Sequence, residues 1–290
     1  MRLDAMAKAV DQTWADDDGT APLVTVRENE VVQRNSGRAG GRRVDRRTFV
    51  KDGVGSPPPG ARADDARSRG VDEQLGALAG SGKLFIHTSG SSIVGTRTKG
   101  HRSDAIFDES SPIVPSPARA ARVALNDLIL SYRDKGCHPV IICPSLIYGL
   151  GHGAEPHSMQ VPLLIDLARK RGCAAHAGLG ENIWSNVHID DLVMLYALAI
   201  EKAPAGSFFF AENGENSMRE VCEAINRMLG HEGAPSPMSM EEATSEWGEG
   251  LAEDTMASNS RVRAVRARQL GWKPRADSLV EEIERGCYRE

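Results

Sequence analysis

Two turns stand at the ends of apolar runs, where a chain could bind a ligand. Residues 88–90 (Thr-Ser-Gly) end an apolar run that starts at Leu84, and residues 144–147 (Pro-Ser-Leu-Ile) follow an apolar run that starts at Pro139. Both runs have the length and composition of buried strands. In open α/β sheets, ligands bind beyond the carboxyl ends of the strands. The pattern therefore predicts a ligand site made by both turns. The alternative is that serine and glycine only build a turn and the proline only ends a strand.

A parallel α/β sheet would position these turns. Between the two apolar runs, Ala121, Leu125, Leu128 and Tyr132 recur every three or four residues, which predicts an amphipathic helix over 118–132. A strand, a helix and a second strand in succession, with both strands apolar throughout, are typical of a buried parallel sheet.

The chain after residue 150 has the pattern of a helix-rich region. Asp190 and Asp191 suit the first turn of a helix that ends near Lys202. Residues 217–220 (Ser-Met-Arg-Glu) form a capping box, which predicts a helix that ends at Gly230.

Composition and charge exclude several classes of protein. The net charge of −5 argues against a broad basic surface for nucleic acid. No apolar run approaches the length of a membrane-spanning helix. The five cysteines are scattered without a C-x-x-C pair, as expected for reduced thiols. We therefore expect a cytoplasmic protein that binds neither nucleic acid nor membrane.

Residues 1–68 differ in amino-acid composition from the rest of the chain. The first isoleucine is Ile86, and residues 35–70 are crowded with arginine, glycine, aspartate and proline. Such a stretch has too little apolar surface to offset the entropy of ordering its backbone. We predict that 1–68 is largely disordered and that 69–290 forms the folded domain, with a substrate lobe over about 150–290.

The histidines and the paired aspartates are interpreted as structural. His188 is predicted to be a hydrogen-bonded core histidine, and Asp190 and Asp191 are predicted to cap a helix rather than bind metal. The remaining histidines share no compact ligand spacing, so no metal site is predicted.

Four motifs follow one another along the chain. They are residues 85–95 (FIHTSGSSIVG), 143–149 (CPSLIYG), 186–192 (NVHIDDL) and 270–274 (LGWKP). Together they resemble the extended short-chain dehydrogenase/reductase family, which includes NAD-dependent epimerases, dehydratases and reductases. The resemblance implies a Rossmann-like doubly wound parallel sheet with a smaller helix-rich C-terminal lobe.

The resemblance also implies a cofactor and a set of site residues. NAD or NADP would exchange a hydride with a carbonyl or alcohol carbon of the substrate, and both turns would face the nicotinamide half. The family's serine or threonine falls on Gly90; Ser89, with Ser91 as the alternative, would orient the oxygen of a small-molecule substrate in its place, and Arg122 would hold the cofactor ribose. The implied cofactor-binding residues are Thr88, Ser89, Gly90, Arg122, Pro144, Ser145, Leu146 and Ile147. A homodimer is also expected.

Two departures from the family pattern stand out. The family's Gly-x-x-Gly-x-x-Gly turn, which lets the backbone approach the pyrophosphate, is absent from residues 1–20, where Gly19 is the one glycine. The sheet is therefore expected to be incomplete at the N-terminus, as a truncated or frame-shifted reading frame would produce. In the catalytic S-P-Y-x-x-x-K motif, Ala118 stands at the tyrosine position and Arg122 at the lysine position.

Without this tyrosine, the residue that donates the proton is not identified by the family motif. Losing a positioned general acid costs about 10²–10⁴-fold in rate, and Tyr148 is the candidate replacement. Ser89, Arg122 and Tyr148 are thus the predicted catalytic residues. The leading hypothesis is an NAD(P)-dependent oxidoreductase of the epimerase/dehydratase type. The alternatives are a non-catalytic member that binds a dinucleotide or a partner, and a defective truncated product.

Overall fold

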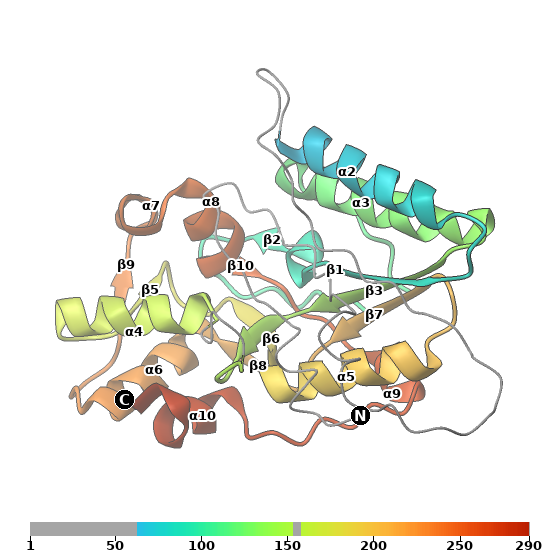
Figure 1. Cartoon of the computed structure of the whole chain (residues 1–290). Helices are drawn as coiled ribbons and strands as arrows, with labels where there is room; N and C mark the ends of the chain where they lie inside the picture. Colours follow the sequence, from blue (N-terminus) through green and yellow to red (C-terminus); the bar gives the residue numbers. More distant parts are fainter. Residues whose placement is uncertain (1–62, 153–157, 290) are drawn as a thin grey trace.

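A three-stranded parallel sheet forms the centre of the described chain, residues 63–152 and 158–289 of a computed structural model (Figure 1). Its strands are β1 (Leu84–Thr88), β3 (His138–Pro144) and β7 (Ser207–Ala211), in the order β1-β3-β7. Both pairs are parallel, and every residue of β3 after His138 is buried. The predicted fold class, a Rossmann-like α/β sheet, is confirmed.

Helices cover both faces of this sheet, which explains why its strands are apolar throughout. Helices α2 (Ala63–Leu78) and α3 (Ala120–Ser131) lie on one face, and α5 (Ile189–Lys202) and α9 (Val265–Gln269) lie on the other (Figure 1). The amphipathic pattern of 118–132 is confirmed as a helix, although its first residues form the separate turn η3 (Pro117–Arg119).

Helix α2 starts earlier than its apolar pattern suggested. It begins at Ala63, so the prediction of disorder was wrong for 63–68, whereas residues 1–62 of that prediction lie outside the described residues. Its first residue is alanine, which is the best helix former.

The C-terminal lobe is rich in helices, as predicted, and is built on short strands. A second sheet has the order β4-β6-β8, and a two-stranded sheet pairs β5 with β9. The strands are β4 (Leu146–Tyr148), β5 (Ala175–Ala177), β6 (Ile183–His188), β8 (Glu215–Ser217) and β9 (Ser236–Met238). The helices are α4 (Gln160–Arg171), α6 (Met218–Leu229), α7 (Met240–Trp247), α8 (Glu249–Leu251) and α10 (Leu279–Arg285). No helix among the described residues is both long and apolar enough to cross a membrane.

The predicted capping box is confirmed at the start of α6. Ser217 Oγ accepts from Glu220 N at 3.2 Å, and the Glu220 carboxylate accepts from Ser217 N at 2.8 Å. The helix ends at Gly230, whose φ of 70° is the left-handed conformation that glycine tolerates.

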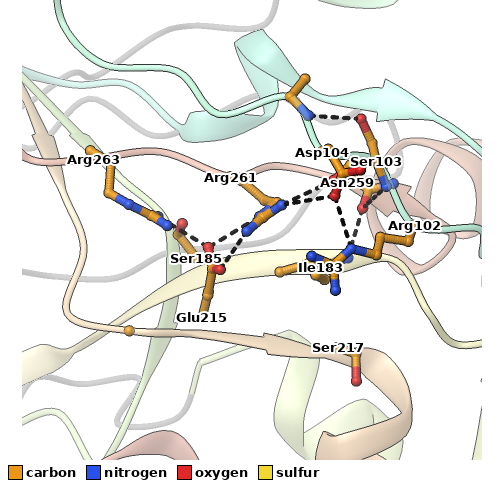
Figure 2. A network of polar contacts seen from close by, with 12 residues as sticks. Arg102, Ser103, Asp104, Ile183, Ser185, Glu215, Ser217, Asn259, Arg261 and Arg263 are labelled. Atoms are coloured by element: carbon orange, nitrogen blue, oxygen red, sulfur yellow. Dashed lines mark hydrogen bonds and ion pairs between the residues drawn. The ribbon is translucent and has the colours of Figure 1, made fainter.

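A buried arginine joins the loop after β2 (Thr96–Arg97) to the C-terminal lobe (Figure 2). Arg261 is 7% exposed and follows β10 (Ser258–Asn259), which pairs with β2. Its guanidinium binds Glu215 through two nitrogens, at 2.6 and 3.2 Å, and donates to the carbonyl of Ser103 at 3.2 Å. Arg263 approaches the same carboxylate at 3.0 Å. This network holds the loop against β8.

Asp191 connects two of the sequence motifs. Its buried carboxylate accepts from Arg275 N at 2.8 Å and Ala276 N at 3.1 Å, while its carbonyl accepts from Trp272 Nε1 at 2.7 Å. The side chain that caps α5 is His188, whose Nδ1 accepts from Asp190 N at 3.1 Å. The structural role predicted for His188 is confirmed, and the capping role predicted for Asp191 was wrong because its carboxylate points to the closing segment.

Removing this connection should destabilise the fold. We expect Asp191→Ala to lower the free energy of unfolding by about 2–3 kcal/mol, because two backbone N–H groups lose a charged acceptor. Asp190→Ala is the matched control, since the Asp190 side chain is 61% exposed and lies 3.7 Å or more from its histidine partners. Thermal unfolding would measure both; equal losses for the two variants would contradict this role of Asp191.

Candidate active site at the strand ends

The two predicted turns lie on neighbouring strands. Thr88 at the end of β1 is in register with Ile142 of β3, and Ser89 N donates to the Ile142 carbonyl at 2.8 Å. Beyond β3, Ser145 donates to the Ala211 carbonyl through its N–H at 3.0 Å and its hydroxyl at 2.9 Å. The carboxyl ends of three parallel strands thus meet at one edge of the sheet.

Thr88 and Ser89 direct their side chains to different helices. The Thr88 hydroxyl contacts the hydroxyl of Tyr196 on α5, and burial raises the pKa of that tyrosine. The Ser89 hydroxyl accepts from Asn126 Nδ2 of α3 at 3.0 Å. Ser89 is 0% exposed, so both hydroxyls serve contacts within the protein.

The next part of the turn is more accessible. Arg122 Nη1 donates to Ser92 Oγ at 3.0 Å, and both side chains are half-buried. Gly90 leaves room for this contact, because a β carbon at Gly90 would lie 3.2 Å from Arg122 Nη1. Ser91, on the turn η2 (Ser91–Val94), is fixed from the lobe: Ser260 Oγ donates to its carbonyl at 2.8 Å and lies 2.9 Å from its hydroxyl.

Ala118, at the position of the missing tyrosine, is exposed, and its neighbour Arg119 is buried. Arg119 lies 3.9 Å from Asp254, whose carboxylate also binds Arg97 at 2.6 Å, and burial lowers the pKa of Arg119. Sequence reasoning missed Ser92, Arg119 and Asn126. Asn126 could have been found from its spacing, because residues four apart on a helix share a face and Arg122 is four residues before it.

The residues of the second turn contribute main chain rather than reactive side chains. Pro144 ends β3 in register with Ala211 of β7, and Leu146 and Ile147 lie in β4 with both side chains buried. Leu146 belongs to the core of the C-terminal lobe, whereas Ile147 belongs to the core of the main sheet. The turn therefore links the two cores.

The model of the "NAD dependent epimerase/dehydratase family" matches residues 65–209, which include β1, α3, β3 and the first part of β7. The chain belongs to this family. An uncharacterised protein of Schizosaccharomyces pombe is 30% identical over 227 residues, which are 77% of this chain and 70% of that protein. An uncharacterised protein of Saccharomyces cerevisiae is 29% identical over 72% of this chain and 65% of its own length.

Solved structures of the epimerase/dehydratase fold agree with the observed architecture. DesIV, a dTDP-glucose 4,6-dehydratase from Streptomyces venezuelae, has a TM-score of 0.59 at 21% identity, covering 77% of this chain and 65% of that enzyme. UDP-glucuronic acid 4-epimerase from Bacillus cereus has a TM-score of 0.59 at 18% identity, covering 78% and 69%. This chain thus spans about two thirds of the length of these proteins, and the similarity shows the shared fold.

Three groups of the described chain have the chemistry to hold one half of a dinucleotide. The Gly90 cradle, the Arg122 guanidinium and the main chain of residues 144–147 could hold a nicotinamide and its ribose at the strand ends. Residues 1–20, where the family's phosphate-binding glycines are expected, lie outside the described residues. Among the described residues, no group of histidine, cysteine and acidic side chains could hold a metal ion.

Tyr148 lies apart from these groups. It is 0% exposed in the core of the C-terminal lobe, and its hydroxyl donates to the Asp277 carbonyl at 2.7 Å. Its ring packs edge-on against His188 with centroids 5.2 Å apart, and burial raises its pKa. A catalytic role for Tyr148 stays a prediction, but this geometry does not favour it, because the hydroxyl proton is engaged and the side chain is buried.

Replacing Tyr148 by phenylalanine distinguishes the two roles. We expect Tyr148→Phe to lower the free energy of unfolding by about 1 kcal/mol, since a single buried hydrogen bond is lost. A general acid would instead lose about 10²–10⁴-fold in turnover. Thermal unfolding and steady-state kinetics on the same preparation would show which loss occurs, and a large kinetic loss without destabilisation would restore Tyr148 as the acid.

Proposed function

We propose that this protein is an NAD(P)-dependent oxidoreductase of the epimerase/dehydratase family that acts on a carbonyl or alcohol group of a small molecule. The observation that carries the proposal is the Arg122–Ser92 contact of 3.0 Å beside Gly90. It puts a permanent cation and a hydroxyl at the carboxyl end of β1, where ligands of such sheets bind.

The residues of this chain would divide the work of binding. A bound nicotinamide dinucleotide would supply or accept the hydride. Arg122 would bind the ribose hydroxyls, and it keeps its charge because a guanidinium does not titrate near neutrality. The main chain of residues 144–147 would border the nicotinamide, and Thr88, Ser89 and Gly90 would form the wall behind it. NAD is the cofactor in the structures of DesIV and of the epimerase, and we propose NAD or NADP here.

The proposed substrate is a small molecule with a carbonyl or alcohol group. The relatives carry different names. One is an oxidase of Acremonium, 29% identical over 69% of this chain and 67% of its own length. The enzymes of the solved structures are named for nucleotide sugars, dTDP-glucose and UDP-glucuronic acid. A carbonyl or carbinol carbon is what a hydride transfer requires. The cytoplasmic location and the homodimer stay predictions.

Ala118 favours a second candidate, a member that binds a dinucleotide without chemistry. Ala118 is exposed at the tyrosine position and cannot donate a proton. A turnover screen separates the two candidates. The full chain would be mixed with NAD⁺, NADH, NADP⁺ or NADPH and a panel of alcohols, aldehydes and ketones, and the absorbance of the reduced nicotinamide would be followed.

In this screen we expect turnover either with NAD⁺ and NADH or with NADP⁺ and NADPH. Arg122→Met should lower kcat/KM by about 10²-fold because a charge-assisted contact to the ligand is lost. Arg133→Met, at an exposed position just after α3, is the matched control. Absence of turnover with every pair, together with tight dinucleotide binding, would replace the oxidoreductase by the non-catalytic candidate.

A further inference from the structure

A buried serine of the C-terminal lobe contacts the turn that follows β1. Ser260 comes directly after β10, and β6 holds its main chain. Its N–H donates to the Ile183 carbonyl at 2.9 Å, and its carbonyl accepts from Ser185 N at 2.9 Å. Its hydroxyl lies against Ser91, the first residue of η2, and both serines are 1% exposed. This buried contact joins the lobe to the end of the central sheet.

The donor of each hydrogen bond in this contact follows from the atoms that take part. Ser260 Oγ lies 2.8 Å from the Ser91 carbonyl and 2.9 Å from the Ser91 hydroxyl. A carbonyl oxygen only accepts, whereas a serine hydroxyl has one proton to donate and can also accept. The Ser260 proton therefore goes to the Ser91 carbonyl, and the Ser91 hydroxyl donates to Ser260 Oγ. The two serines form a reciprocal pair that uses both of their protons.

This pair removes Ser91 from the residues that could orient a substrate oxygen. Ser91 is the alternative to Ser89 in the family resemblance, but its proton is engaged by Ser260 and its side chain is buried. A substrate would have to break a buried hydrogen bond to reach it, and a buried hydroxyl without a partner costs free energy. Ser91 therefore acts through its place in the turn.

Gly90 is held by the residues on either side of it, because it has no side chain to fix its own position. Before it, Ser89 N donates to the Ile142 carbonyl of β3 at 2.8 Å. After it, the Ser91–Ser260 pair ties the turn to the lobe. The main chain at Gly90 is thus fixed between the sheet on one side and the lobe on the other.

The same pair fixes the first half of η2. Ser92, in that half, accepts from Arg122 Nη1 at 3.0 Å. The second half of η2 is anchored separately, because Ile93 and Val94 are buried in the core of the main sheet. The first half consists of two serines and has no apolar side chain to anchor it, so its position depends on Ser260.

We propose that Ser260 is a positioning residue for the dinucleotide site. It acts through Ser91 and holds the turn where the Gly90 main chain and the Arg122 guanidinium can bind the nicotinamide ribose. The inference rests on the proposed function and deepens it, because it assigns part of the cofactor site to the C-terminal lobe. Groups that bind a ligand must be held to within about 0.5 Å, so loss of the pair should weaken dinucleotide binding.

Ser185→Ala is the matched control for Ser260→Ala. Ser185 is 0% exposed, and its hydroxyl also makes two hydrogen bonds, to the Val262 carbonyl at 3.1 Å and from Val262 N at 2.9 Å. Because each variant loses a buried hydroxyl with two hydrogen bonds, we expect Tm to fall by roughly 2–8 °C in both. The variants should differ in their affinity for the dinucleotide.

Titration calorimetry of the full chain with NAD⁺, NADH, NADP⁺ and NADPH measures this affinity. For the dinucleotide that binds the parent, Ser260→Ala should raise Kd about tenfold, and Ser185→Ala should leave Kd within about twofold. Ser91→Ala removes one hydrogen bond and keeps the one from Ser260 to the Ser91 carbonyl, so Kd should rise about threefold. In the Ser260→Ala background, Ser91→Ala should raise Kd by less than about twofold, because the contact is already lost.

Three results would overturn the inference and leave the proposed function standing. They are a Kd within about twofold of the parent in Ser260→Ala, an equal weakening in Ser185→Ala, and a larger weakening in Ser91→Ala than in Ser260→Ala. If Ser260→Ala does not fold, Ser91→Ala decides, and a Kd equal to that of the parent overturns the inference. A parent protein that binds none of the four dinucleotides would instead overturn the proposed function, and the inference with it.

Discussion

Replacing Gly149 by alanine should lower the free energy of unfolding by about 3–4 kcal/mol. Gly149 has a φ of 90°, and an added β carbon would lie 2.4 Å from Nε2 of His188. The His188 ring cannot move away easily. Its Nδ1 accepts from Asp190 N, and the ring packs in a T-shaped arrangement against Tyr148. Backbone strain and overpacking therefore add, and Tm should fall by roughly 6–15 °C.

Gly172 supplies the control for this prediction. It has a φ of 72°, and an added β carbon would meet nothing within 4 Å. Gly172→Ala should therefore lower the free energy of unfolding only by the left-handed backbone strain, which is about 1 kcal/mol. Thermal unfolding of the two variants would isolate the clash with His188, and equal destabilisation would mean that the 149–188 contact is loose in solution.

Arg261→Met should be the second large effect, at about 2–3 kcal/mol. Arg261 is the least exposed charge of the network in Figure 2, and its loss leaves Glu215 with Arg263 as its remaining cation and the Ser103 carbonyl without its donor. Arg102→Met is the matched control, because the Arg102–Asp104 pair is 58% and 87% exposed and exposed pairs contribute little.

The effect of Arg261→Met should depend on pH. Arg261, through its hydrogen bonds, is the largest cause that lowers the pKa of Glu215 below 4.5. A carboxyl with a lowered folded-state pKa contributes stability that is fully present above its unfolded pKa and is lost as the pH falls through the folded value. The Tm difference between parent and Arg261→Met should therefore be constant above pH 4.5 and shrink below it; a difference that grows in acid would contradict this account of the pair.

The sequence predicted those parts of the fold that depend on local patterns. The apolar runs at Leu84 and Pro139 became paired strands, and the capping box at Ser217 began a helix, because hydrophobic burial and capping act over a few residues. The family motifs were recognised for the same reason. Both predicted turns lie at one edge of the sheet, as parallel strands require.

The remaining features depend on contacts between distant residues, which no local pattern contains. Asp191 had the right position for a cap, but its acceptor capacity is used by backbone groups some 84 residues away. Ser89 and Ser92 look alike in sequence; only their neighbours on α3, Asn126 and Arg122, separate a buried hydroxyl from an accessible one. The start of α2 was missed because polar residues dominate its first turns.

We propose that this chain binds a nicotinamide dinucleotide at the carboxyl ends of β1 and β3. The most direct measurement is the thermal unfolding of the full chain with NAD⁺, NADH, NADP⁺ or NADPH, beside Arg122→Met and Arg133→Met. A ligand that binds only the native state stabilises it by about 2.7 kcal/mol at 100 times Kd. We predict a rise in Tm with at least one dinucleotide, reduced in Arg122→Met and kept in Arg133→Met. No shift with any of the four, or the same shift in both variants, would contradict the claim.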